Sequence, residues 1–391
     1  MRLIVVLLTS VLLGLAGASS GAAGEQSPGA VDTLRAEIEA LREVVADLEA
    51  QVARTLPGLH SYRLPDAMVF AGHPVPLERG DVAERFEREF YITLAQPAQV
   101  VLWLKRSARY FPYIEERLRT AGLPDDLKYV AVAESALLPR ALSWARASGI
   151  WQFIDDTARR YGLRVSKAWD ERRDPERSTT AAIAYLKDLH AQFNDWPLAL
   201  AGYNAGERRV STALREQGVT EYYRLVLPAE TERYLFRILA AKLILEAPER
   251  YGFTVPPQER YAPHATATVT VTVTGHLLLR ELGAAAGSYY REIRTLNPAI
   301  AGDRLPPGRY TVRIPETGRA RFASARAELE RTMAARAARR KTYRVRRGDT
   351  LGGIARRFGV TIAELRRWNA AARRILHPGD VLVIERAGAA K

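Results

Sequence analysis

The sequence predicts a mainly α-helical protein that ends in two small βααβ units. Across residues 60–255, apolar residues recur at spacings of three and four, the period of a helix with one buried face. At residues 265–273 threonine instead alternates with alanine or valine, as in a half-buried strand. The order strand–helix–helix–strand then occurs twice before the end of the chain, which indicates an internal repeat.

The composition allows a packed core and excludes several chemistries. The chain has 391 residues, of which 47% are hydrophobic, enough for more than one domain. It has no cysteine, so disulfides, thiol catalysis and thiolate metal sites are excluded. Its six histidines lack any metal-ligand spacing. We therefore expect no metal site and no cofactor.

The N-terminal segment, residues 1–18, has the pattern of a signal peptide. Arg2 precedes an apolar run from Leu3 to Leu15, and a small-residue cleavage site follows. The run is shorter than the roughly 20 residues of a membrane span, although an uncleaved anchor is the alternative. We expect an exported protein of the periplasm or cell envelope that is not a lipoprotein, because it has no cysteine to carry a lipid.

Two further segments precede the helical domain. Residues 19–30 are small and polar, which predicts a linker. Residues 31–56 carry a heptad pattern of apolar residues, which predicts a helix that self-associates, docks on its own domain or stays a marginal arm. The apolar positions are Leu34, Ile38, Leu41, Val45, Leu48 and Val52.

The remaining segments follow from changes in periodicity and charge. Residues 60–255 form one helical domain, residues 265–316 the first and less regular βααβ unit, and residues 342–386 the second. Residues 317–341 are basic and alanine-rich, which predicts a helical linker that is solvated or weakly attracted to anionic wall polymers or a membrane surface. The net charge of +14 favours acidic partners, and the export signal argues against nucleic acid.

Glu134 is the strongest candidate for acid–base chemistry. It closes an apolar helical run over residues 128–133. Burial disfavours a charged carboxylate and raises its pKa, and a carboxyl group that is protonated near neutral pH can donate a proton to a glycosidic oxygen. The alternative is a solvent-facing glutamate at the end of a helix.

Later segments place polar and aromatic residues within the otherwise apolar domain. Ser143 follows Glu134 by nine residues, then come residues 149–153 with Trp151 and Gln152, and residues 202–206 with Tyr203. Sugars bind to such mixtures, because flat rings cover their apolar faces and fixed polar groups contact their hydroxyls. Trp151 also fits a plain core position.

Together these motifs resemble the lysozyme-like lytic transglycosylase family. The resemblance covers roughly residues 65–255 and rests on several segments in order. They are Arg109–Glu115, Gly122–Tyr129, Glu134–Pro139, Ser143, Gly149–Phe153, Thr157-Ala158, Tyr161–Leu163, Tyr203–Gly206 and Glu230–Tyr234. One departure is Ile154-Asp155-Asp156 before Thr157, which adds negative charge at the groove edge or caps a helix.

The resemblance implies an enzyme that cleaves peptidoglycan glycan strands without water. Glu134 would be the single acid and base, and 1,6-anhydro-N-acetylmuramic acid ends would form at the bond to N-acetylglucosamine. The residues implied in substrate binding are Ser135, Ser143, Gln152, Phe153, Tyr203, Asn204 and Glu230. A hydrolytic lysozyme-type muramidase and a non-catalytic peptidoglycan-binding protein are the alternatives.

The second βααβ unit resembles the LysM family, which binds glycans that contain N-acetylglucosamine. The resemblance rests on Tyr343–Leu351, Ile354-Ala355, Phe358–Val360, Trp368-Asn369 and His377–Ile384. The glycan-binding residues that we expect there are Gly348, Asp349, Thr350, Leu351, Leu376 and Pro378. The first unit resembles a degenerate copy, with either weak binding or a structural role.

Overall fold

The computed structural model describes residues 38–41, 61–369 and 376–385. The expected signal peptide and linker, and the heptad pattern except for a helical piece at residues 38–41, lie outside the described residues. The chain divides into two compact units, residues 1–63 and residues 64–391. The helical domain and both βααβ modules belong to the second unit. Among the described helices, none combines the length and the hydropathy needed to cross a bilayer.

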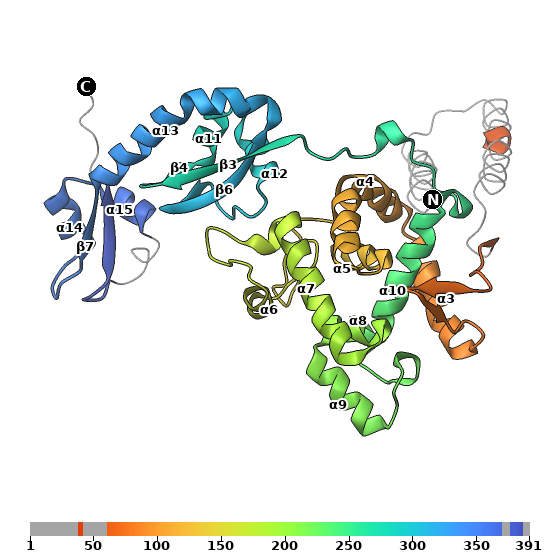
Figure 1. The fold of residues 1–391 in the computed structure, drawn as a ribbon. Helices are drawn as coiled ribbons and strands as arrows, with labels where there is room; N and C mark the ends of the chain where they lie inside the picture. Colours follow the sequence, from red (N-terminus) through yellow and green to blue (C-terminus); the bar gives the residue numbers. More distant parts are fainter. Residues whose placement is uncertain (1–37, 42–60, 370–375, 386–391) are drawn as a thin grey trace, which may run out of the picture. The chain divides into compact units, whose positions relative to one another are not determined.

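The second unit begins with a helical domain, whose first elements form a short hairpin (Figure 1). The hairpin turns at Ala71 and Gly72, which both have positive φ. Its elements are β1 (Met68–Phe70), β2 (His73–Val75), α3 (Gly80–Leu94), α4 (Pro97–Thr120), η3 (Asp125–Leu127), α5 (Lys128–Ser135), α6 (Asp155–Arg160), η4 (Glu171–Arg173), α7 (Pro175–Phe193), α8 (Trp196–Ala205), α9 (Glu207–Gln217), η5 (Tyr222–Arg224), α10 (Ala229–Glu246), η6 (Pro248–Tyr251) and η7 (Pro257–Glu259).

The short helix α5 lies in the middle of this domain. Residues 129–133 are all buried, and α5 packs against α4 and α10, while α10 also contacts α3 and α8 (Figure 1). The helices α7 and α8 begin at Asp174 and Asp195, whose carboxylates accept backbone N–H bonds, each followed within two residues by proline. The apolar run of α5 is thus core, and only its last turn reaches a surface.

Two βααβ modules follow, which confirms the predicted fold class. The first module contains β3 (Thr266–Val273), β4 (Leu277–Leu278), α11 (Leu279–Ala285), α12 (Tyr290–Leu296), β5 (Arg304–Leu305) and β6 (Gly308–Pro315), and then η8 (Glu316–Gly318) and α13 (Arg319–Arg339). The second contains β7 (Arg340–Arg344), α14 (Leu351–Phe358), α15 (Ile362–Trp368) and β8 (Val381–Glu385). In each module the first and last long strands pair antiparallel.

One asparagine in each module makes the same three hydrogen bonds. Asn297 donates through Nδ2 to the carbonyls of Ile293 and Arg313, and its Oδ1 accepts from the Arg313 N–H. Asn369 repeats this pattern with Leu365 and Val383. Both asparagines are buried and join the second helix of their module to its last strand. This shared contact supports the prediction that the modules are copies of one motif.

The basic segment that was expected to be a linker forms α13, and one face of this helix is buried. Phe322, Leu329 and Met333 complete the core of the first module. On its other faces, arginines pair with nearby glutamates, as in Arg326 with Glu330 at 2.8 Å. The helix is therefore part of the module, and its positive charge is partly neutralised within the helix.

The second module has its own core. It consists of Tyr343, Val345, Ile354, Ala355, Leu365, Leu382 and Ile384, none of which belongs to the core of the first module. The second module can therefore unfold without unfolding the first.

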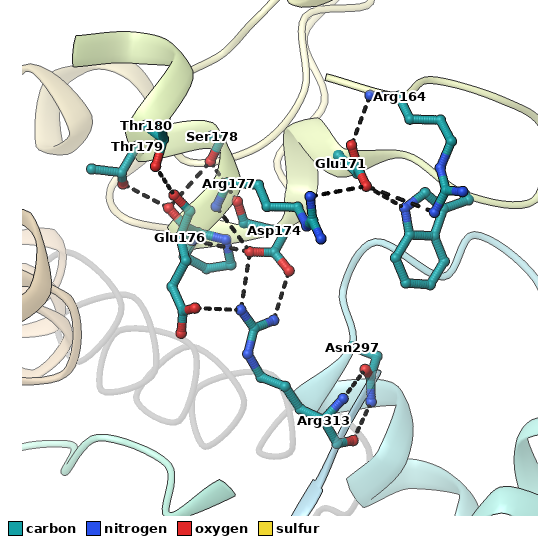
Figure 2. Close-up of polar contacts among 12 residues, drawn as sticks. Arg164, Glu171, Asp174, Glu176, Arg177, Ser178, Thr179, Thr180, Asn297 and Arg313 are labelled. Carbon is teal, nitrogen blue, oxygen red and sulfur yellow. Dashed lines mark hydrogen bonds and ion pairs between the residues drawn. The ribbon is translucent and has the colours of Figure 1, made fainter. Parts of the chain in front are cut away.

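The first module docks on the helical domain through the loop that follows α12. The Asp170 N–H donates to the Ala299 carbonyl at 2.8 Å, and the Ala301 N–H donates to the Ala168 carbonyl at 3.1 Å. Beside this loop, Arg313 on β6 binds the buried Asp174 carboxylate with two hydrogen bonds, of 2.6 and 3.2 Å (Figure 2). The segment before α7 is thus fixed to the module.

Candidate active site

Glu134 lies in the last turn of α5, where the buried part of the helix meets the surface. Its side chain is largely enclosed, and burial raises the pKa of its carboxyl group from 4.5 to about 7. A hydrogen bond from Tyr234 and the charge of Arg237 oppose this increase in pKa, while the charge of Glu230 adds to it. The carboxyl group can therefore hold or release a proton near neutral pH.

A strained turn fixes the end of α5. Ala136 and Leu137 both have left-handed backbones, with φ values of 53° and 59°, which non-glycine residues rarely adopt. Arg106 donates from Nη1 to the Ala136 carbonyl at 3.1 Å. Two more positive φ values, at Arg146 and Gln152, lie in the loop that follows. Such conformations are kept at functional sites, where the surrounding structure determines the backbone.

Two tyrosines border Glu134, of which Tyr234 is buried and Tyr203 is partly buried. The Tyr234 hydroxyl on α10 donates to Glu134 Oε1 at 2.5 Å. The Tyr203 hydroxyl on α8 donates to the Trp151 carbonyl at 2.7 Å. Burial and the nearby charge of Glu134 raise the pKa of both tyrosines well above 10, so they remain hydrogen-bond donors. The sequence resemblance included Tyr234 in a motif but gave it no role.

Glu230 lies one helical turn before Tyr234. It is exposed in the first turn of α10, and residues four apart share one face of a helix. Its effect on the pKa of Glu134 agrees with this placement. The expected groove residue and the carboxyl group therefore lie on the same side of the domain.

The loop over residues 141–153 presents Ser143 and Gln152. Ser143 is exposed, and its Oγ accepts from the Ala147 N–H at 3.0 Å. Gln152 is partly buried, and its Nε2 donates to the Gly149 carbonyl at 2.7 Å. Both side chains thus also stabilise the loop. Trp144, which the sequence analysis did not select, is fully exposed in the same loop.

Ser135 and Phe153, which were expected to contact substrate, are buried. Ser135 Oγ donates to the Ile150 carbonyl at 2.9 Å and joins the end of α5 to the loop. Phe153 packs against the rings of Tyr185 and Tyr203. Both residues position the groups that border the site.

Asn204 is partly buried, and its side chain connects two helices. Its Oδ1 accepts a hydrogen bond from Thr231 Oγ1 at 2.8 Å, which joins the end of α8 to the first turn of α10. This bond uses the amide oxygen, so the Nδ2 group can donate to a ligand.

A salt-bridged pair supports the loop from behind. Arg172 binds the Asp170 carboxylate at 2.8 Å and donates to the carbonyls of Arg146 and Phe153 at 3.0 and 3.1 Å. Gly149 passes so close that a Cβ atom there would lie 1.8 Å from the Arg172 carbonyl oxygen. Asp170 also donates its N–H to the first module. The Asp170–Arg172 pair therefore contacts both the loop and the module.

The acidic pair that departs from the family pattern begins a helix. Asp155 and Asp156 are exposed in the first turn of α6, where negative charge is favourable. Asp155 pairs with Arg159 at 2.6 Å. Ile154 occupies the N-cap position and no side-chain hydrogen bond caps the helix, so the pair contributes first-turn charge and not a cap.

The glycan-binding residues expected in the second module lie on two neighbouring turns. Gly348, Asp349 and Thr350 precede α14, and Leu376 and Pro378 precede β8; backbone bonds between Val345 and residues 379–380 hold the turns together. Asp349 accepts from the Arg346 N–H and the Tyr343 hydroxyl, and Thr350 caps α14. Leu351 and Leu376 pack on the module core, while Gly348 and Pro378 are exposed.

Two parts of the chain match known protein families, one in the helical domain and one in the second module. Residues 112–226 match the family described as "Transglycosylase SLT domain", and residues 343–385 match "LysM domain".

Among individual proteins, the chain is similar to membrane-bound lytic murein transglycosylase D of Escherichia coli strain K12. The two are 32% identical over 292 residues, which is 71% of this chain and 64% of the relative. The chain thus spans slightly less than two thirds of that protein. A shorter similarity, 44% identity over 52 residues, links 13% of the chain to 18% of N-acetylmuramoyl-L-alanine amidase XlyA of Bacillus subtilis strain 168.

Two solved structures were also matched. The 70 kDa soluble lytic transglycosylase of Escherichia coli is 19% identical, with a TM-score of 0.33 over 48% of this chain and 34% of that one. An inactive mutant of lytic transglycosylase Slt from Pseudomonas aeruginosa is 23% identical, with a TM-score of 0.29 over 39% and 26%.

Proposed function

We propose that this chain is a peptidoglycan lytic transglycosylase. It would cleave the β-1,4 bond between N-acetylmuramic acid and N-acetylglucosamine and leave 1,6-anhydro ends. The observation that carries the proposal is the carboxyl group of Glu134, whose pKa is about 7 and which accepts a hydrogen bond from Tyr234. The match to the transglycosylase SLT domain supports the same activity.

In this reaction Glu134 acts first as an acid and then as a base. Its proton moves to the glycosidic oxygen while the bond from that oxygen to C1 of the muramic residue breaks. The C6 hydroxyl of the same residue then attacks C1, and its proton returns to Glu134. No water is consumed, and the substrate's acetamido group takes the place of a second carboxylate.

The other roles at the groove follow from exposure. Ser143, Gln152, Tyr203, Asn204 and Glu230 would contact the sugars next to the cleaved bond. Each is at least partly exposed and lies on the loop after α5, at the end of α8 or at the start of α10.

The second module would hold the enzyme on its polymeric substrate. Its two neighbouring turns would bind glycan, and tethering through a short connection raises the local concentration of enzyme on the wall. We place the protein in the periplasm or cell envelope, without a lipid anchor, and retain self-association through residues 31–56 as a hypothesis. The similar Escherichia coli protein is described as membrane-bound.

Mass spectrometry of digested wall sacculi tests the activity. We expect anhydro ends from the wild-type chain and a loss of at least about 100-fold in Glu134→Gln, with binding to sacculi retained. Reducing ends would show a hydrolytic muramidase instead. Binding without cleavage by the wild type would show a non-catalytic binding protein, and comparable turnover by the variant would remove Glu134 from the mechanism.

A further inference from the structure

A cavity lies beside the turn that follows Glu134. Its volume is about 790 Å³, and it is formed by α4, residues 137–141, the start of α7 and the first module. Much of the lining is apolar or aromatic, including Tyr110, Tyr113 and Leu138. The cavity exists because the first module is docked, since Leu296, Pro298 and Arg313 form one wall.

Besides Arg313, three arginines line this cavity, and each donates to a backbone carbonyl; Arg109 also contacts the Tyr110 hydroxyl and lies 5.2 Å from the centre of the Tyr261 ring. Arg106 Nη1 donates to Ala136 at 3.1 Å, Arg109 Nε to Ala262 at 3.0 Å, and Arg140 Nη2 to Arg294 at 3.0 Å. Within residues 61–369 and 376–385, none of the three guanidinium groups has a salt bridge to a carboxylate. The cavity therefore carries uncompensated positive charge.

The carboxylate on the cavity wall does not balance this charge. Glu176 lines the cavity, but it is paired with Arg313 at 2.8 Å (Figure 2), and Asp174 is bound by the same arginine. The surroundings of Arg140 disfavour its positive charge. Burial, with the charges of Arg294 and Arg173, lowers its pKa from 12.5 to about 10. A bound anion would relieve this cost.

We propose that this cavity binds the carboxylate-bearing peptide stem of a peptidoglycan strand. The inference rests on the proposed function and deepens it, because it names the part of the substrate that lies beyond the sugars. Guanidinium groups bind carboxylates with two parallel hydrogen bonds, and the apolar wall suits the methyl groups of alanine. A cavity of this size holds a ligand of a few residues.

The position of the cavity gives the stem a path to it. Its wall includes Leu137 and Leu138, three and four residues after Glu134, and the stem is attached to the sugar whose bond Glu134 would cleave. A filled cavity would also contact the strained turn at Ala136 and Leu137 that fixes the end of α5.

Calorimetric titration of the full chain tests the proposal, in the Glu134→Gln background so that no ligand is consumed. The probes are a disaccharide of N-acetylglucosamine and N-acetylmuramic acid, the same disaccharide with its tetrapeptide, and the free tetrapeptide. We expect the tetrapeptide to increase the affinity of the disaccharide by at least about tenfold. The gain should shrink at high salt.

Substitutions separate the cavity from general charge. Arg140→Gln should remove most of the gain from the tetrapeptide, and Arg291→Gln, an exposed arginine on α12 outside the cavity, should keep it. Because Arg140 also binds the docked module, Arg109→Gln provides a second test that leaves that contact intact. Thermal unfolding of each variant checks its fold.

The outcomes are distinct. Equal affinities with and without the tetrapeptide, or equal losses in Arg140→Gln and Arg291→Gln, would overturn the proposal. If wild-type chain fails to cleave sacculi but still binds the free tetrapeptide in an Arg140-dependent way, the proposed enzyme activity fails and the peptide site stands. If cleavage occurs and no peptide gain is seen, only the peptide site fails.

Discussion

The Tyr234 hydroxyl donates a hydrogen bond of 2.5 Å to Oε1 of Glu134 and joins α10 to the last turn of α5. This bond favours the charged carboxylate, whereas burial favours the neutral acid. The two effects leave the pKa of the group at about 7. Glu134 can thus give up a proton and take it back, as a single acid and base must.

The rate of wall cleavage should fall as the pH rises above about 7. The first step needs protonated Glu134, and the protonated fraction drops about tenfold per unit of pH above its pKa of about 7. Initial rates on soluble glycan fragments between pH 5 and 9 measure this. A rate that is constant up to pH 9 would contradict the assigned acid.

Tyr234→Phe should move this fall in rate to higher pH. The substitution removes the hydrogen bond that stabilises the charged carboxylate, so the pKa of Glu134 rises further. The control is Tyr222→Phe, another buried tyrosine, whose hydroxyl donates to the carbonyls of Thr231 and Glu232. A profile that moves equally in both variants, or in neither, would mean that the bond does not control the proton.

Glu134→Gln should stabilise the fold at pH 8 relative to wild type. The pKa of Glu134 is about 7 in the folded protein and 4.5 when unperturbed. The folded wild type therefore binds more protons between these values and loses stability as the pH rises through 7. The difference should approach about 3 kcal/mol at most above pH 7 and shrink toward pH 4.5. Thermal unfolding at pH 5 and pH 8 measures it, and a difference that is the same at both would contradict the buried acid.

Arg313→Ala should weaken the docking of the first module. It leaves the Asp174 carboxylate, which is 5% exposed, with only its helix-capping bonds, at an expected cost of about 2 kcal/mol. Arg309→Ala, exposed on the same strand, is the matched control. The free energy of unfolding in denaturant measures both. If the two variants unfold alike, the pair does not hold the interface.

Deletion of residues 342–391 should weaken retention on sacculi and spare cleavage of short soluble fragments. The core of the second module is separate from the core of the first, so the deletion should not unfold the helical domain. Sedimentation with sacculi and turnover of soluble fragments measure the two properties. Loss of both would mean that the module is structural.

Local patterns made much of this fold predictable. The strands and helices of both modules follow the change from helical to strand periodicity, and the strand expected at residues 265–273 forms as Thr266–Val273. The role of α13 was not predictable in this way, because Phe322, Leu329 and Met333 are widely spaced in a basic segment. Their burial depends on a sheet that other residues supply.

The sequence by itself determined the helical class, the repeat and the position of Glu134 at the end of an apolar helix, because these depend on residues close together in the chain. Only the tertiary structure decided that Tyr234 bonds Glu134, that Ser135 and Phe153 face inward, and that the first module docks through Arg313 and Asp174. Those contacts join residues about 100 positions apart or more, or depend on which face a packed neighbour covers. Packing determines these contacts, and no local sequence pattern predicts them.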